Sequence, residues 1–76
     1  MRALLKDDDG NYRAINVVEI KYDEDDLELV IYNGDQANTC FCIKNVTSSG
    51  ARMAIREIYT HDKVDLSTYK FYEADY

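Results

Sequence analysis

The alternation of apolar and polar residues along the first half of the chain predicts a series of β-strands. Residues 1–6 predict a short strand that ends in the turn-forming run Asp7-Asp8-Asp9-Gly10-Asn11. Residues 12–22 alternate over a greater length and predict a second strand, and residues 27–32 predict a third. The four acids Asp23-Glu24-Asp25-Asp26 then form a tight loop between the second and third strands.

The register of this hairpin follows from which side chains must share a face. Successive side chains of a strand point to opposite faces, so a shift of one residue would move every apolar side chain to the wrong side. The four-residue acidic loop satisfies this condition. We therefore expect three apolar pairs on one face: Tyr22 with Leu27, Ile20 with Leu29, and Val18 with Ile31.

The next turn allows two registers. Asn33-Gly34 is a strong signal for a two-residue type I′ hairpin, but that register leaves Phe41 and Ile43 on the face opposite Leu29. A five-residue loop over residues 33–37 instead pairs Leu29 with Phe41. We favour the longer loop because it keeps the apolar residues on one side of the sheet.

Helical spacing replaces the strand pattern after the fourth predicted strand, about residues 38–46. Each hydroxyl of Thr47-Ser48-Ser49 is suited to cap a helix by accepting a hydrogen bond from a free backbone N–H. The apolar residues that follow recur at helical spacing: Ala51, Ala54, Ile55 and Ile58. Residues 64–73 predict a last strand, with a bulge near Ser67-Thr68 because the alternation slips there.

The predicted fold is α+β and forms a single domain over residues 1–76. It is an antiparallel β-meander of four strands, one amphipathic helix packed on one face, and a C-terminal strand (β-β-β-β-α-β). A helix of roughly 12 residues is about 18 Å long and 10 Å wide, whereas five strands span roughly 24 Å. The uncovered part of the sheet must curl into a partial barrel, be polar, or pack against a second copy. An apolar remainder would exceed the patch that monomers usually expose, so we expect a homodimer.

Charge is concentrated in the first half of the chain and restricts the class of partner. The net charge is -6, and residues 1–36 contain ten Asp and Glu against four Lys and Arg, whereas residues 37–76 contain five of each. This acidity disfavours direct binding of nucleic acid or of a membrane surface, and it favours a basic protein partner. No apolar stretch approaches a signal-peptide core or a membrane span, so the sequence predicts a cytoplasmic location.

The acidic turn after the first strand resembles a calcium loop only superficially. If Gly10 occupied the glycine position of an EF-hand loop, the first and twelfth ligands would be Leu5 and Asn16, which carry no carboxylate. We therefore interpret Asp7–Asn11 as a hairpin turn.

Cys40 and Cys42 fall on the same face of a strand, where a mutual disulfide would be strained. Only His61 offers a nitrogen donor, so a zinc set is incomplete within one chain, although a dimer would bring four thiols together. We expect buried or half-buried reduced thiols. His61 near the helix end is interpreted as a favourable charge against the helix dipole, and Arg52 and Arg56 as ordinary exposed helix residues.

The seven Tyr residues leave two interpretations open. Tyr suits protein contact surfaces, because it combines apolar area with a polar tip. It is equally a good residue for half-buried positions of strands.

The sequence therefore predicts a non-catalytic protein–protein interaction module that self-associates, because it contains no phosphate-binding loop, nucleophile with base, or complete metal set. The alternative is an acidic DNA mimic that inhibits a nucleic-acid-binding enzyme, of the phage or mobile-element anti-restriction or anti-CRISPR type. A meander separates the two acidic turns by roughly 20 Å, which disfavours one continuous acidic stripe. A small enzyme with a pocket at a dimer interface is a third possibility.

No catalytic residue, cofactor or metal is assigned. The candidate partner-binding residues are Asp7, Asp8, Asp9, Asp23, Glu24, Asp25, Asp26, Tyr69 and Tyr72.

Overall fold

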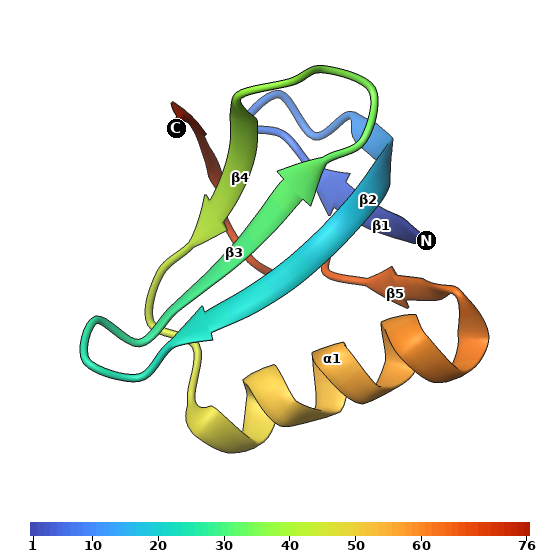
Figure 1. The fold of residues 1–76 in the computed structure, drawn as a ribbon. Helices are drawn as coiled ribbons and strands as arrows, with labels where there is room; N and C mark the ends of the chain where they lie inside the picture. The colour runs from blue at the N-terminus through green and yellow to red at the C-terminus, as the bar shows by residue number, and fades with distance from the viewer.

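The computed structural model describes all residues 1–76 and shows a small α+β domain with one helix and one mixed sheet (Figure 1). The sheet order is β5-β1-β2-β3-β4-β6, and only the β5–β1 pair is parallel. The elements are β1 (Arg2–Lys6), β2 (Tyr12–Asp23), β3 (Glu28–Asn33), β4 (Thr39–Ile43), α1 (Ser48–His61), β5 (Lys63–Asp65) and β6 (Tyr72–Asp75). The predicted four-stranded meander and the helix after it are therefore present, but the part after the helix differs from the prediction.

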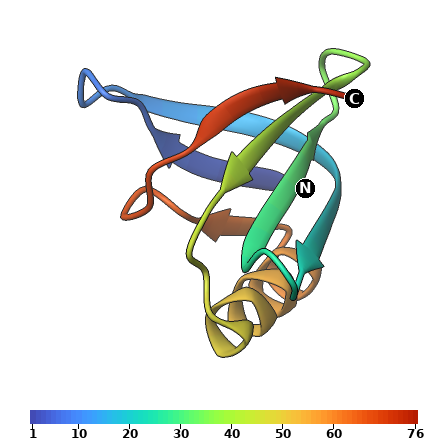
Figure 2. The ribbon, with the colours of Figure 1, turned by 90° about the vertical axis from the view of Figure 1, so that its left-hand side faces the viewer.

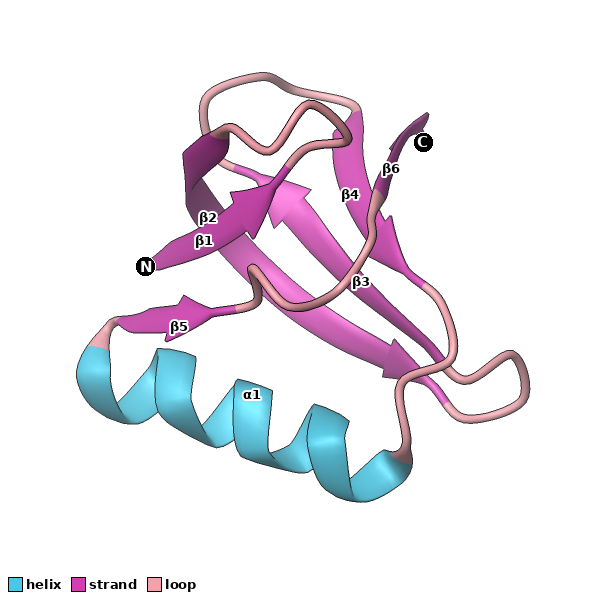
Figure 3. Cartoon of the chain, turned by 180° about the vertical axis from the view of Figure 1, so that it is seen from behind, coloured by secondary structure: helices cyan, strands magenta, loops and turns pink.

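The single last strand predicted over residues 64–73 is wrong. β5 pairs with β1 at one edge of the sheet, whereas β6 pairs with β4 at the other edge. Residues 66–71 cross from one edge to the other (Figure 3). The slip in alternation near Ser67-Thr68 marks this crossing and is not a bulge. The Asp65 carboxylate starts the crossing by accepting hydrogen bonds from the backbone N (2.9 Å) and the hydroxyl (2.6 Å) of Ser67. These bonds lower the pKa of Asp65.

A β-bulge lies instead in the middle of β2. Val17 is opposite Asn33 and Glu19 is opposite Tyr32, so Val18 is the extra residue of the longer strand. The bulge reverses the inside–outside alternation: Val17 is buried, whereas the side chain of Val18 is 66% exposed. The predicted pairing of Val18 with Ile31 is therefore wrong, because uniform alternation over residues 12–22 does not allow for an extra residue.

The β2–β3 hairpin is shifted by two residues from the predicted register. Tyr22 lies opposite Leu29 and Ile20 lies opposite Ile31, so the same faces are buried as expected. Leu27 does not belong to the strand. It adopts a left-handed backbone conformation (φ 53°) in the turn, where its side chain is exposed.

The β3–β4 hairpin has the longer loop that the apolar pattern favours. Five residues, 34–38, separate β3 from β4, one position later than predicted. The predicted pairing of Leu29 with Phe41 is wrong by two residues, because the loop begins one residue later. Leu29 pairs with Ile43 and Ile31 pairs with Phe41, and all four side chains are buried. The two-residue Asn33-Gly34 turn is absent because it would have moved the apolar residues of β4 to the wrong face.

The helix begins where the hydroxyl run predicts. The Thr47 side chain accepts a hydrogen bond from the Gly50 backbone N at 3.1 Å and caps the first turn. The predicted apolar stripe is confirmed, since Ala51, Ala54 and Ile58 are buried. α1 lies below the sheet, beside β5 and the second half of β2 (Figures 1 and 2).

The sheet curls around its own core, as Figure 2 shows. Arg13 of β2 and Glu73 of β6 form an ion pair at 2.7 Å, although β3 and β4 lie between their strands in the sheet order. Three strand spacings in a flat sheet would separate them by about 14 Å. The curled sheet therefore covers its own concave side, together with the helix. The packing argument for a homodimer applies only to the convex outer side. The side chains of the concave side and the helix form the core: Ala3, Leu5, Ile15, Val17, Ile20, Leu29, Ile31, Phe41, Ile43, Val46, Ala51, Ala54, Ile58, Val64 and Leu66.

Candidate interaction face

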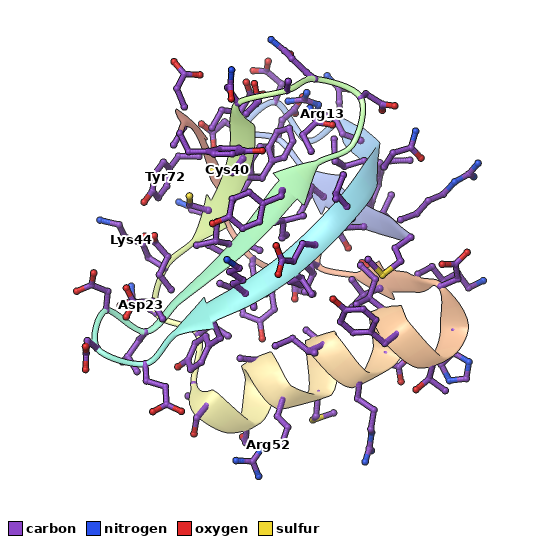
Figure 4. All side chains as sticks on the ribbon, viewed as in Figure 1. Arg13, Asp23, Cys40, Lys44, Arg52 and Tyr72 are labelled. Carbon is purple, nitrogen blue, oxygen red and sulfur yellow. The ribbon has the colours of Figure 1, made fainter.

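The outer side of β3, β4 and β6 carries thiols and aromatic rings without any element packed over it. Two rows of side chains cross the three strands: Val30, Cys42 and Tyr72 in one, and Tyr32, Cys40 and Ala74 in the other. The second half of β2 continues these rows with Glu19 and Lys21. We call this surface the convex face and define it by Glu19, Lys21, Glu28, Val30, Tyr32, Cys40, Cys42, Lys44, Tyr72, Ala74 and Tyr76. Figure 4 shows Cys40, Lys44 and Tyr72 on this side, whereas Arg52 projects from the helix, away from the sheet.

The two thiols are buried beneath the surface of the convex face. Cys40 and Cys42 are 5% and 4% exposed, their Sγ atoms are 3.8 Å apart, and neither forms a disulfide. The expectation of buried, free thiols is thus confirmed. Burial, followed by the neighbouring Cys40 thiol, raises the pKa of Cys42 to about 11. The neutral thiol of Cys42 is therefore the form present at neutral pH.

Three tyrosine rings lie on the same face as the thiols, and one of them, Tyr72, contacts both a negatively and a positively charged side chain. The Tyr72 hydroxyl donates a hydrogen bond to the Glu28 carboxylate at 2.6 Å, which raises the pKa of Tyr72 because the bond holds its proton. The ammonium group of Lys44 lies 5.6 Å from the centre of the Tyr72 ring. At the other end of the face, Tyr32 and Tyr76 meet edge to face with ring centres 4.9 Å apart.

The structure separates the two tyrosines that the sequence assigned to one partner site. Tyr69 lies in the crossing segment, where its half-buried side chain packs against the core. Tyr72 lies on the convex face, together with Tyr32 and Tyr76, which were not among the predicted site residues. The outward position of Tyr32 follows from its alternation with Leu29 and Ile31. The position of Tyr76 depends on the pairing of β6 with β4, which has no local signal.

The acidic turns use one carboxylate each to hold their own backbone. The carboxylate of Asp7 accepts hydrogen bonds from the backbone N of Asp9 (3.0 Å) and of Asn11 (2.8 Å), which bears out the hairpin-turn interpretation. The carboxylate of Asp23 accepts bonds from Asp25 (3.0 Å) and Asp26 (3.3 Å) in the same way. The remaining acids of the two turns are exposed: Asp8, Asp9, Glu24, Asp25 and Asp26.

The two acidic turns are not brought together. They lie at opposite ends of β2, one at the top and one at the lower left of Figure 1. Between them the convex face carries Lys21 and Lys44 as well as Glu19 and Glu28. The candidate acids therefore form two separate clusters with mixed charge between them.

A shallow cavity of about 710 Å³ lies between the end of α1 and strands β1 and β5. It is lined in part by Arg2, Lys63, Asp65 and His61. The His61 Nε2 atom is 3.8 Å from the Glu57 carboxylate, one helical turn earlier, and both side chains are more than half exposed. Charges of both signs line this cavity without converging on one point, so its geometry favours no particular ligand.

No protein-family model, no curated protein and no solved structure matches this chain. The one helix lacks the length and apolar character that crossing a membrane requires.

Proposed function

We propose that the protein is a non-catalytic interaction module that self-associates through the convex face. The observation that supports this proposal is the presence of three tyrosine rings over two buried thiols, on a side of the sheet where nothing else packs. Tyrosine is enriched in protein interfaces because its ring supplies contact area and its hydroxyl remains satisfied by water or a partner.

The charges of the convex face suit contact with a second copy. In a two-fold dimer the same patch is used by both chains, so it must be complementary to itself. Glu28 begins β3 and Lys44 directly follows β4, and Lys21 lies 3.9 Å from Glu19, so the face carries both signs of charge along its length. An interface of standard size buries about 800 Å² of each partner. This is about 16% of the total surface of 5142 Å² and requires most of one face.

The experiment that tests this function is light scattering over a micromolar concentration series. We expect the mass to rise from 8.8 kDa toward twice that value as the concentration increases. Lys44→Glu should weaken the association, and Glu28→Lys combined with Lys44→Glu should restore it. Arg56→Glu, on the exposed side of the helix, provides a matched charge reversal that should change nothing. A mass near 8.8 kDa at all concentrations would contradict the proposal.

The second candidate is capture of a basic protein by the exposed acids of the turns, as in a DNA mimic. Five carboxylates of the two turns form no hydrogen bonds within the chain, which favours this function. The two acidic turns lie apart, however, and support it less than one continuous acidic stripe would.

A further inference from the structure

We propose that two copies of the chain bind one zinc ion, or another thiol-seeking metal ion, through Cys40 and Cys42 of each copy. This inference rests on the proposed self-association through the convex face and identifies what holds the two copies together.

The spacing of the thiols fits two ligands of a tetrahedral metal. Zinc–sulfur bonds of about 2.3 Å in a tetrahedral site place the ligand sulfurs about 3.8 Å apart. The Sγ atoms of Cys40 and Cys42 are already 3.8 Å apart. They match one edge of the coordination tetrahedron without rearrangement, whereas a disulfide would require them to approach to about 2.05 Å.

One chain supplies only half of such a site. No third His, Cys, Asp or Glu side chain joins the two thiols in a metal-binding group. The Glu28 carboxylate on the same face accepts the hydrogen bond of Tyr72 in the single chain. Structural zinc sites are almost always four-coordinate. A two-fold axis that passes close to the pair on β4 would bring the second pair of thiols from the other copy.

The charged groups around the thiols are compatible with this assembly. A zinc ion bound by four thiolates carries a net charge of about -2, because its formation releases four thiol protons. The ammonium groups of two Lys44 side chains, one from each copy, offset this charge, with Lys21 farther along the same face. The Glu28 carboxylate of each copy opposes it.

Access to the thiols requires the surrounding rings to turn aside. The rings of Tyr72 and Tyr76 lie at the surface, 41% and 61% exposed, and belong to the short terminal strand or the residue after it. Three side-chain contacts hold the Tyr72 ring: its hydroxyl donates to Glu28 and also contacts the Cys42 thiol, and its face lies near the Lys44 ammonium group. Rotation of these rings therefore disturbs no core residue.

Titration of the reduced full chain with Co²⁺, followed by Zn²⁺, tests the proposal directly. We expect thiolate-to-cobalt charge transfer and the intense bands of tetrahedral cobalt, saturation at one metal per two chains, and displacement of Co²⁺ by Zn²⁺. The mass should double with the metal, and Zn²⁺ should protect both thiols from alkylation by iodoacetamide. Affinity should rise with pH, because the metal competes with the thiol protons. Saturation at one metal per chain, the absence of thiolate bands, or no metal uptake at micromolar concentration would overturn the inference.

Single variants and a chelator separate this inference from the proposed function. Cys40→Ser and Cys42→Ser should each reduce metal affinity at least tenfold, whereas His61→Gln should retain it. The alkylation measurement uses the unaltered chain, so it remains decisive if either serine variant fails to fold. If the dimer persists in chelator, and the chelator-free titration shows no metal uptake, the metal site is overturned but the proposed function remains intact. A chain that binds metal while its mass stays at 8.8 kDa overturns the shared site.

Discussion

Arg13 and Glu73 lie 60 residues apart in the sequence, yet their side chains form an ion pair at 2.7 Å that joins β2 to β6. The Arg13 guanidinium also lies 5.3 Å from the centre of the Phe41 ring and 6.0 Å from that of Phe71. Figure 4 shows Arg13 at the end of the sheet away from the helix. One side chain thus covers an aromatic end of the core and links two strands that the sheet order separates.

Replacing Arg13 by Ala should destabilise the fold by about 1 kcal/mol. A partly exposed ion pair contributes about 0.2–1 kcal/mol, and an exposed cation–π contact contributes about 0.5–1 kcal/mol. Urea unfolding measures the change, and Arg56→Ala on the helix is the control, with an expected change within about 0.5 kcal/mol. Equal stability of the Arg13 variant and the unaltered chain would contradict the closure of the sheet described here.

The bulge in β2 predicts opposite outcomes for two neighbouring valines. Val17→Ala should cost about 2 kcal/mol, because it removes buried methyl groups and leaves a cavity. Val18→Ala should change the free energy of unfolding by less than about 0.5 kcal/mol, because the Val18 side chain is exposed. Chemical denaturation of the two variants side by side provides the measurement. Similar costs at both positions would mean that β2 contains no bulge.

The cap of the helix should be specific to Thr47. Thr47→Ala removes the acceptor of the Gly50 N–H, and we expect a loss of about 1 kcal/mol. Thr47→Asp should retain the stability, since a carboxylate also caps and is favoured by the helix dipole. Ser48→Ala, one residue later, is the control in thermal unfolding. A larger loss at Ser48 than at Thr47 would place the cap elsewhere.

Stability should fall between pH 9 and pH 11 because of Cys42. Its pKa is about 11 in the folded protein against 9.0 for an unperturbed thiol, so the unfolded chain loses this proton first as the pH rises. The contribution is fully present below pH 9 and is lost as the pH rises toward 11. Urea midpoints measured across this range should decrease less steeply in Cys42→Ala than in the unaltered chain. Parallel pH profiles for the two proteins would show that burial does not perturb this thiol.

The exposed acids of the turns should be separable from self-association. Converting Asp8, Asp9, Glu24, Asp25 and Asp26 to their amides, while retaining Asp7 and Asp23, changes the net charge from -6 to -1. Light scattering should then give the same dimerisation, because none of the five lies on the convex face. A pull-down at low and high salt compares this variant with the unaltered chain. Capture of a DNA- or RNA-handling enzyme that is lost in the variant and at high salt would favour the mimic.

Local patterns of the sequence predicted the elements that local interactions decide. The hydroxyl run before the helix, the helical stripe and the five-residue loop each follow from caps or alternation within a few residues. Residues 64–73 contain no comparable signal, because β5 exists only through its parallel pairing with β1, and β6 only through its pairing with β4. The bulge at Val18 is equally hidden, since adding one residue to a strand leaves each half of its alternation intact.

The candidate site was likewise predictable only where local spacing decides which face a side chain occupies. The shared face of Cys40 and Cys42 follows from their spacing alone, and Tyr72 was among the predicted residues. Placing Tyr76 beside Tyr32 requires the edge pairing of β6, so the complete convex face emerges only in three dimensions.

Both edge strands of the sheet come from residues 63–75, after the helix. During synthesis the first four strands therefore leave the ribosome as a ribbon with two unpaired edges, each able to recruit a strand from another nascent chain. The β1 edge stays open until residues 63–65 emerge, and the β4 edge until residues 72–75 emerge. The interval between the emergence of β4 and that of these segments thus sets how long the unfinished sheet can pair with other nascent chains.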